Sequence, residues 1–241
     1  MKKLLRAVFV GLGLEPVWFM YWLFMWVLTS LVRTQRAGSC PKRPCVLAVI
    51  HLGGLEPLFV TRASRHWRGW ALYTLDWPNP LVRFLCQAFW RFGVTQDPKR
   101  KAAINPKTIK RATEYLRSGG SLMVFPEGVR LWERRLYPGA ALLARRAGVP
   151  LIPVGLENAP IHEPGPEKLP VWRGFPRALW KTVRKRRVVV HFAEAILPDP
   201  KLSEEEDVDR MMRELERVFR DFYQRFYGVP GPVWINPRRA R

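Results

Sequence analysis

Residues 46–57, VLAVIHLGGLEP, join an apolar run to a histidine, a glycine pair and a glutamate. Five consecutive apolar residues ended by a turn signal are typical of a buried β-strand. Similar apolar runs recur at residues 122–125, 151–155 and 188–192, and a weaker one spans residues 70–75. The sequence therefore predicts several short strands, with His51 at the end of one of them.

Stretches of helical periodicity separate these runs. They cover residues 80–92, 105–119, 139–147 and 203–228. In the second stretch, Asn105 predicts the helix cap and Pro106 the first helical residue. In the last stretch, Ser203 and Glu206 form a capping box and Gly228 predicts the end. Strands that alternate with helices indicate an α/β fold, which we expect to be a mixed sheet flanked by helices.

The first forty residues differ from the rest. Glu15 is the only charged residue between Arg6 and Arg33, and residues 16–32 form an uncharged run of seventeen. That length is at the lower limit for a membrane-spanning helix, and basic residues flank both sides, so charge predicts no orientation. We expect a membrane-associated helical segment at 1–40, a folded domain at 41–228 and a basic tail at 229–241. A buried core helix is the alternative reading of the N-terminal run.

The composition restricts the class of partner. The chain has 241 residues, 41 Lys and Arg against 20 Asp and Glu, a net charge of +21, and 11 Trp. Such a charge suits an anionic membrane surface, an acidic carrier protein or nucleic acid, and Trp with Arg favours a membrane interface. A thermophilic or GC-rich source is the alternative explanation. The cysteines Cys40, Cys45 and Cys86 form no C-x-x-C pair, which predicts no metal site, no disulfide framework and a reducing compartment.

His51 is the first candidate for chemistry. It ends an apolar strand, and Glu56 follows five residues later across a glycine turn. Histidine is the natural general base near neutral pH, and it needs a carboxylate to fix its tautomer and stabilise its charged form. A single histidine near a strand end is more often structural, so this pair needs support from elsewhere in the chain.

A second candidate site lies at residues 121–131, SLMVFPEGVRL. An apolar strand delivers Glu127, the exposed backbone of Gly128 and the guanidinium of Arg130 to one turn. Arginine binds phosphate bidentately, and turn N–H groups add to such a site. The segment predicts an anion pocket. His66, His162 and His191 have no acidic residue at a suggestive spacing, and His191 is expected to be a packed or edge residue.

With these residues the chain resembles the glycerophospholipid acyltransferase family, best known for the lysophosphatidic acid acyltransferases. That family carries His-x4-Asp, a Gly–Arg block, Phe-Pro-Glu-Gly-Thr-Arg and a Val-Pro-x-x-Pro-Val-like strand. The first, third and fourth blocks match residues 51–56, 125–130 and 149–154 in the same order. Two features depart from the pattern. Glu56 replaces the aspartate, and residues 92–100 lack the usual Asp-Arg pair, so Arg100 or Lys99 is the expected cation.

The resemblance implies direct acyl transfer, with His51 as base and Glu56 as its orienting carboxylate. It implies substrate contacts from Glu127, Gly128, Arg130, Arg100 and Pro153, and no metal or cofactor. The donor would be acyl-ACP or acyl-CoA and the acceptor lysophosphatidic acid, at the cytoplasmic face of the cell membrane, with membrane phospholipids as partners and no nucleic acid. The altered blocks keep another lipid or glycolipid hydroxyl open as acceptor. A basic membrane- or nucleic-acid-binding protein without catalysis is the alternative from another class.

Overall fold

The computed structural model describes residues 23, 26–39, 42–52, 55–65, 71–75, 92–95, 97–128, 134–159 and 179–235. Several of the features predicted from the sequence lie outside these residues. Most of the N-terminal apolar run, residues 80–91 of an expected helix, Arg130, and the tail from residue 236 lie outside the described residues. The same holds for His66 and His162.

A five-stranded mixed sheet forms the centre of the molecule, in the order β1-β8-β7-β2-β5. The strands are β1 (Arg33–Ala37), β2 (Cys45–Val49), β5 (Ser121–Val124), β7 (Leu151–Glu157) and β8 (Arg187–Phe192). β2 runs parallel to β5 and β7, β1 runs parallel to β8, and only the β7–β8 pair is antiparallel. That single reversal brings the beginnings of β1 and β8 to the edge where β2, β5 and β7 end.

Two short strand pairs extend this arrangement. β3 (Leu72–Thr74) pairs in parallel with β4 (Phe92–Val94), and Ala71 bridges in parallel to Met123 of β5. β4 therefore ends at the same edge of the sheet as β5. The second pair joins β6 (Arg135–Leu136) to β9 (Val233–Trp234).

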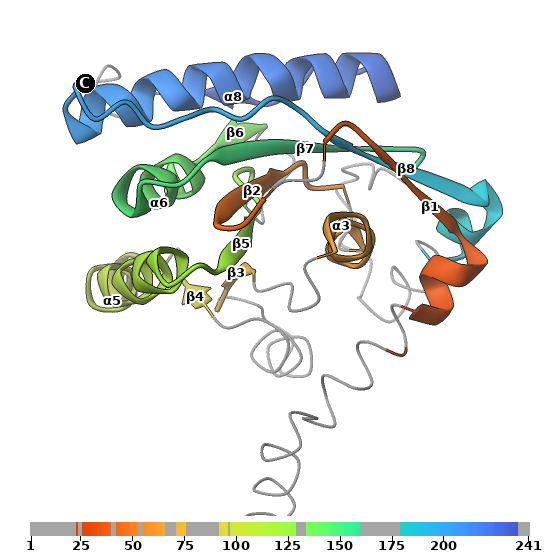
Figure 1. The fold of residues 1–241 in the computed structure, drawn as a ribbon, viewed down its shortest axis with the longest axis horizontal. Coiled ribbons are helices and arrows are strands. Elements are labelled where there is room, and N and C mark those ends of the chain that lie inside the picture. The colour runs from red at the N-terminus through yellow and green to blue at the C-terminus, as the bar shows by residue number, and fades with distance from the viewer. Residues whose placement is uncertain are drawn as a thin grey trace, which may run out of the picture.

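Helices cover both faces of the sheet, as Figure 1 shows. They are α3 (Glu56–Ser64), α5 (Pro98–Arg117), α6 (Gly139–Ala147) and α8 (Glu204–Tyr227). α6 and α8 contact each other and β7, α3 contacts β1 and β8 from the other side, and α5 packs against α6, β4 and β5. Helical residues also occur at 26–31 and 179–185. The predicted mixed sheet flanked by helices is confirmed.

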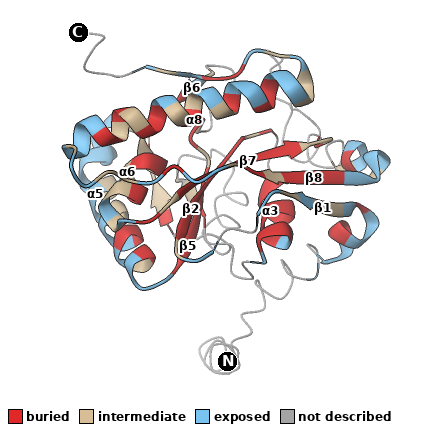
Figure 2. Cartoon of the chain, turned by 45° about the horizontal axis from the view of Figure 1, so that its top comes forward, coloured by how far each residue is buried: buried red, intermediate tan, exposed pale blue. Residues whose placement is uncertain are grey.

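The core lies between the central strands and these helices, where Figure 2 shows most of the buried residues. All five residues of β2 are buried because helices cover the sheet on both faces. α8 buries one face of an otherwise charged helix, including Met211, Met212, Leu215 and Phe219. Asp207 is also fully buried there, and Arg145 of α6 (3.1 Å) and Arg210 (2.6 Å) neutralise its charge.

The helix expected from Asn105 begins earlier, so that prediction was wrong at its start. Asp97 caps α5 by accepting a hydrogen bond from the Lys99 N–H, and Pro98 occupies the first turn. The Asn105 side chain instead accepts from the Thr95 N–H and donates to the Thr95 carbonyl, which ties α5 to the end of β4. The helices expected at 139–147 and after Ser203 are confirmed, including the capping box and the left-handed Gly228.

The sheet extends into the first forty residues. Leu28 and Val32 are buried, and β1 pairs with β8 along its whole length. β1 was not predicted because its sequence RTQRA is polar, which is common for an edge strand with one solvent-facing side. Among the helices of the described residues, none has the length and apolar character needed to cross a bilayer.

The first turns of α5 and α8 differ sharply in charge. α8 begins with the acidic residues Glu204, Glu205, Glu206 and Asp207. Such residues are favourable at a helix N-terminus because the macrodipole is positive there. α5 has no acidic residue in its first turn, and Lys99, Arg100 and Lys101 stand there instead. Cations at this end are unfavourable for the helix because of its dipole. Their presence is therefore not explained by a contribution to the stability of α5.

Candidate active site

His51 follows the buried strand β2 at the edge where β2, β5 and β7 end. The Ile50 N–H donates to the Val154 carbonyl (3.0 Å), which fixes the strand up to the residue before the histidine. The His51 side chain is 18% exposed, and its ring lies 4.9 Å from the ring of Phe125. The histidine is thus held by packed neighbours yet remains open to a reactant.

Glu56 reaches the His51 ring from the first turn of α3. Its Oε1 lies 3.2 Å from His51 Nδ1, its side chain is only 2% exposed, and it also accepts from the Leu52 N–H. A carboxylate on Nδ1 keeps the proton on that nitrogen and leaves Nε2 as the free base. Burial lowers the pKa of His51, but the hydrogen bond and charge of Glu56, with the charge of Glu127, outweigh it and raise the pKa above 6.5.

Glu127 lies beneath the histidine rather than in an open pocket. It is 3% exposed, and its Oε1 accepts the His51 backbone N–H at 2.9 Å. Burial raises the pKa of Glu127 to about 7, against the hydrogen bonds from His51 and Tyr223 that lower it. The sequence predicted a substrate contact for Glu127; among the described residues, its contacts are with the protein itself and hold the His51 backbone.

Tyr223 of α8 completes this arrangement and was not identified from the sequence. Its hydroxyl lies 2.8 and 3.0 Å from the two carboxylate oxygens of Glu127 and 3.3 Å from the His51 carbonyl oxygen. Burial and the neighbouring Glu127 raise the pKa of Tyr223, so the hydroxyl stays protonated and donates. The only sequence signal was a tyrosine on the apolar face of α8.

Gly128 forms the turn after Glu127. It has φ +64°, and an added Cβ would lie 3.3 Å from the Tyr137 ring, so a side chain here would be strained. The Gly128 N–H donates to the Phe125 carbonyl (3.0 Å), and the Tyr137 N–H donates to the Pro126 carbonyl (2.7 Å). These bonds hold Gly128 and Tyr137 in place; residues 129–133, including Arg130, lie outside the described residues.

Arg100 and Pro153 are not in contact with His51. Arg100 is exposed in the first turn of α5, at the same edge of the sheet as His51. Pro153 is buried in β7 and pairs with Ala48, three residues before the histidine. The structure therefore brings His51, Glu56, Glu127 and Gly128 together and leaves these two residues further out.

A second His–Glu pair joins β7, the neighbour of β2, to β8. His191 of β8 has its Nε2 3.0 Å from Oε2 of Glu157 at the end of β7, and its ring lies tilted against the Phe226 ring, 4.5 Å away. Sequence spacing could not reveal this pair, because Glu157 reaches His191 across the antiparallel β7–β8 pair. Its expected packing was confirmed. Within the described residues, no group of three His, Cys, Asp or Glu side chains could hold a metal ion.

The structure resembles that of a Thermotoga maritima protein described as the 1-acyl-sn-glycerophosphate (LPA) acyltransferase PlsC, at 20% identity and a TM-score of 0.48. That match covers 79% of this chain and 73% of the other. A search of the curated proteins finds no match. Residues 31–157, just over half of the chain and including His51, Glu56 and Glu127, match the Acyltransferase family. The chain therefore belongs to the Acyltransferase family.

Proposed function

We propose that this acyltransferase moves a fatty acyl group from acyl-ACP or acyl-CoA to the free hydroxyl of lysophosphatidic acid, a step of phospholipid biosynthesis. One observation carries the proposal most directly. Glu56 lies 3.2 Å from Nδ1 of His51, which leaves Nε2 without a hydrogen-bond partner among the described residues, on a side chain that is 18% exposed. That is the geometry required to take a proton from an acceptor hydroxyl.

The reaction needs no covalent enzyme intermediate. Nε2 of His51 takes the proton of the acceptor hydroxyl while its oxygen attacks the thioester carbonyl carbon. The tetrahedral intermediate then collapses, the carbon–sulfur bond breaks, and the imidazolium returns its proton to the leaving thiolate. Glu56 stabilises the imidazolium throughout, which is why its buried carboxylate matters for the rate. We propose that the reaction uses no metal and no cofactor.

Binding of the acceptor requires a cation near the histidine. Arg130 follows Gly128 by two residues, and Arg100 is exposed at the same edge of the sheet. We propose that Arg130, with the backbone N–H groups near Gly128, binds the acceptor phosphate, and that Arg100 adds a second charge. Pro153 then contributes to the site only through β7, by fixing the strand beside β2.

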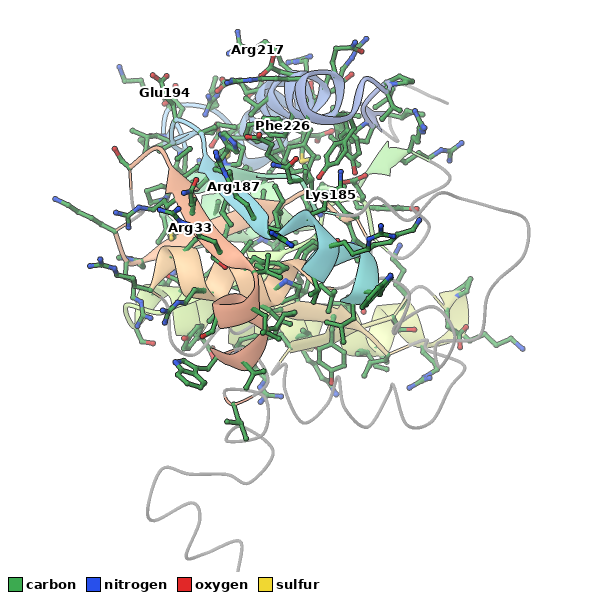
Figure 3. The ribbon with its side chains drawn as sticks, turned by 90° about the vertical axis from the view of Figure 1, so that its right-hand side faces the viewer. Arg33, Lys185, Arg187, Glu194, Arg217 and Phe226 are labelled. Atoms are coloured by element: carbon green, nitrogen blue, oxygen red, sulfur yellow. The ribbon has the colours of Figure 1, made fainter. Side chains whose placement is uncertain are left out.

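We propose further that the protein works at the cytoplasmic face of the cell membrane. Exposed aromatic and aliphatic side chains occur at the helical residues 26–31 and 179–185; they are Trp26 (49%), Val27 (41%), Leu31 (62%) and Trp180 (63%). Arg33, Lys185 and Arg187 lie on the same side of the molecule (Figure 3). Apolar side chains beside cations suit an anionic bilayer surface, where each cation contributes about 1 kcal/mol.

This surface, which we call the aromatic–basic surface, lies at the edge of the sheet that carries His51. β8 runs antiparallel to β7, so the beginnings of β1 and β8, with the preceding helical residues, reach the edge where β2 ends. A lipid acceptor in a bilayer at this surface would lie at the same edge of the sheet as the proposed base. The arrangement supports a membrane-derived hydroxyl over a water-soluble one.

The test is acyl transfer by the purified protein, with His51→Ala as the paired variant. Acyl-ACP and acyl-CoA are offered with lysophosphatidic acid, and separately with a phosphate-free lipid alcohol. His51-dependent transfer to lysophosphatidic acid is the expected result. Transfer only to the phosphate-free alcohol would keep the mechanism and replace the acceptor, and no transfer to either would contradict the proposal.

A further inference from the structure

The outer face of α5 is strongly basic, with one acidic residue, Glu114, near the middle of the same face. The helix carries seven cations and one acid, Glu114, and all eight side chains are exposed. At about 100° per residue, six of the cations lie within roughly 120° of the helix circumference. These six, which we call the α5 basic face, are Lys99, Arg100, Lys107, Lys110, Arg111 and Arg117. The buried residues Ala112, Thr113 and Leu116 lie on the opposite side.

Little in the fold explains the α5 basic face. In the described part of the chain, none of its cations forms an ion pair, and only the Arg117 guanidinium makes a hydrogen bond, to the Arg146 carbonyl. On α8, by contrast, Arg210, Arg213 and Arg220 are each paired with an acid one turn away. Lys99 and Arg100 also oppose the helix dipole. The face is therefore arranged for something outside the chain.

The face differs from the aromatic–basic surface in a way that identifies the kind of partner. No large apolar side chain of α5 is exposed, whereas Trp26, Leu31 and Trp180 are. An interfacial helix binds a bilayer through an apolar face as well as through charge. A basic face without exposed apolar side chains suits a soluble, acidic partner instead.

The size of the face points to a protein. Its cations span positions 99–117, about 27 Å along the helix axis. That is close to the diameter of one side of a standard protein interface of about 800 Å². A small anionic ligand such as coenzyme A would engage only a few of the six cations.

The position of α5 relates this face to the acyl donor. β4 runs parallel to β3, which continues from the Ala71 bridge to β5, so β4 ends at the edge where β5 delivers Glu127. α5 begins just after β4 and therefore starts at that edge. In the sheet order, β5 and α5 lie at one end, β1 and β8 at the other, and the strand of His51 lies between them.

We propose that the α5 basic face docks an acidic acyl carrier protein, which presents its acyl thioester to His51 while the lipid acceptor arrives from the aromatic–basic surface. The inference rests on the proposed function and deepens it by naming the donor carrier. Electrostatic attraction over the whole face speeds encounter and sets the orientation of the carrier, and the thioester arm then reaches the edge of the sheet.

The experiment compares two donors on one variant of the full chain. Lys107→Glu, Lys110→Glu and Arg111→Glu together reverse the middle of the face without altering Arg100. We expect the KM for acyl-ACP to rise about tenfold or more while kcat is unchanged. The KM for acyl-CoA should stay within about twofold, because a small donor does not need the face.

A matched control carries the same change of charge on α8 and just before it, as Lys201→Glu, Arg217→Glu and Arg225→Glu; Arg217 is labelled in Figure 3. All three are exposed, and this variant should show no difference between donors. An equal rise in KM for both donors, or the same acyl-ACP effect in the control, would overturn the proposal. So would loss of binding to anionic phosphatidylglycerol vesicles by the α5 variant, with donor kinetics intact, since that assigns the face to the membrane.

Direct binding separates this proposal from the proposed function. Holo-acyl carrier protein is titrated against the wild-type chain and the α5 variant at low and high salt. Salt-sensitive binding that the variant loses supports docking, even if lysophosphatidic acid proves the wrong acceptor. Absence of binding to the wild type contradicts docking, even if acyl transfer from acyl-CoA is observed.

Discussion

The protein contains two histidine–glutamate pairs of similar length in very different surroundings. His51 meets Glu56 at 3.2 Å, and His191 meets Glu157 at 3.0 Å. Glu56 is 2% exposed and bonds Nδ1, whereas Glu157 is 36% exposed and bonds Nε2. In the first pair the Nε2 atom of His51 is therefore left for a reactant. In the second pair Nε2 is occupied, and only the Nδ1 atom of His191, which is nearer the backbone, is left.

The distance alone does not distinguish a catalytic pair from a structural one. Among the described residues, Nε2 of His51 has no hydrogen-bond partner, and His51 follows a strand end and is held by Glu127, whereas His191 lies within a strand against Phe222 and Phe226. A water-exposed carboxylate also stabilises an imidazolium much less than a buried one does. The burial of Glu56 and its contact with Nδ1 therefore favour the first pair for the proposed role of base.

The largest expected effect comes from Glu56→Gln, which breaks the first pair. By analogy with triad carboxylates, kcat should fall about 10³–10⁴-fold, because the amide no longer stabilises the imidazolium. Glu56 raises the pKa of His51, so its loss lowers that pKa and moves the acid limb of the pH–rate profile to lower pH. Acyl-transfer rates from pH 5 to 9 measure both; a limb that stays in place would contradict the assigned pairing.

Glu127→Gln should change stability in a pH-dependent way. The folded pKa of Glu127 is about 7 against an ordinary 4.5, so the wild type loses stability as pH rises between these values. This pKa difference corresponds to a loss of roughly 3 kcal/mol in the free energy of unfolding of the wild type at high pH. The glutamine variant has no titrating group there and does not show this loss. Urea unfolding at pH 5 and pH 8 checks it. The variant should gain stability relative to the wild type only at pH 8, and an equal gain at both would contradict the buried charge.

Tyr223→Phe should reduce kcat/KM about tenfold by freeing Glu127 and the His51 carbonyl. Tyr227→Phe is the matched control on the next turn of α8, since its hydroxyl donates to the Leu156 carbonyl instead. Both variants lose a buried hydroxyl and about 1 kcal/mol of stability. Equal losses of activity, measured as initial rates at matched folded fraction, would show that Tyr223 acts only through packing.

The smallest effect should come from Glu157→Gln, which weakens the second pair. Because the His191 ring packs against Phe226 and the pair is partly exposed, activity should stay within about threefold of the wild type. Acyl transfer under the conditions used for Glu56→Gln makes the comparison direct. A loss approaching that of Glu56→Gln would mean that the second pair also takes part in the reaction.

Much of the fold could be predicted from the sequence, and the elements that were missed have a clear physical cause. Apolar runs predicted β2, β5, β7 and β8, and the capping box predicted α8, because those signals are local. Asn105 was wrongly predicted as a helix cap because its side chain instead bonds the Thr95 backbone after β4. Sequence rules for helix caps do not detect such a contact. Edge strand β1 has no apolar pattern to reveal it.

The site shows the same division. His51 and Glu56 are five residues apart, so their spacing predicted the contact that the structure contains. Glu127 was identified from the Phe-Pro-Glu-Gly motif. Its hydrogen bond to the His51 backbone depends on the register between β2 and β5, which cannot be predicted from the sequence. Tyr223 and the pairing of Glu157 with His191 depend on packing across 96 and 34 residues, respectively.

The contact between Tyr223 and His51 spans 172 residues, and this has a consequence for the order in which the protein matures. During synthesis the histidine and its glutamate leave the ribosome long before α8 does. Closing so long a loop is among the slowest steps of folding, because its entropy must be lost before the contact forms. A nascent chain that ends before residue 223 therefore has the base and its carboxylate but lacks the hydroxyl that holds Glu127 and the His51 backbone. Full activity should emerge only when the last helix docks.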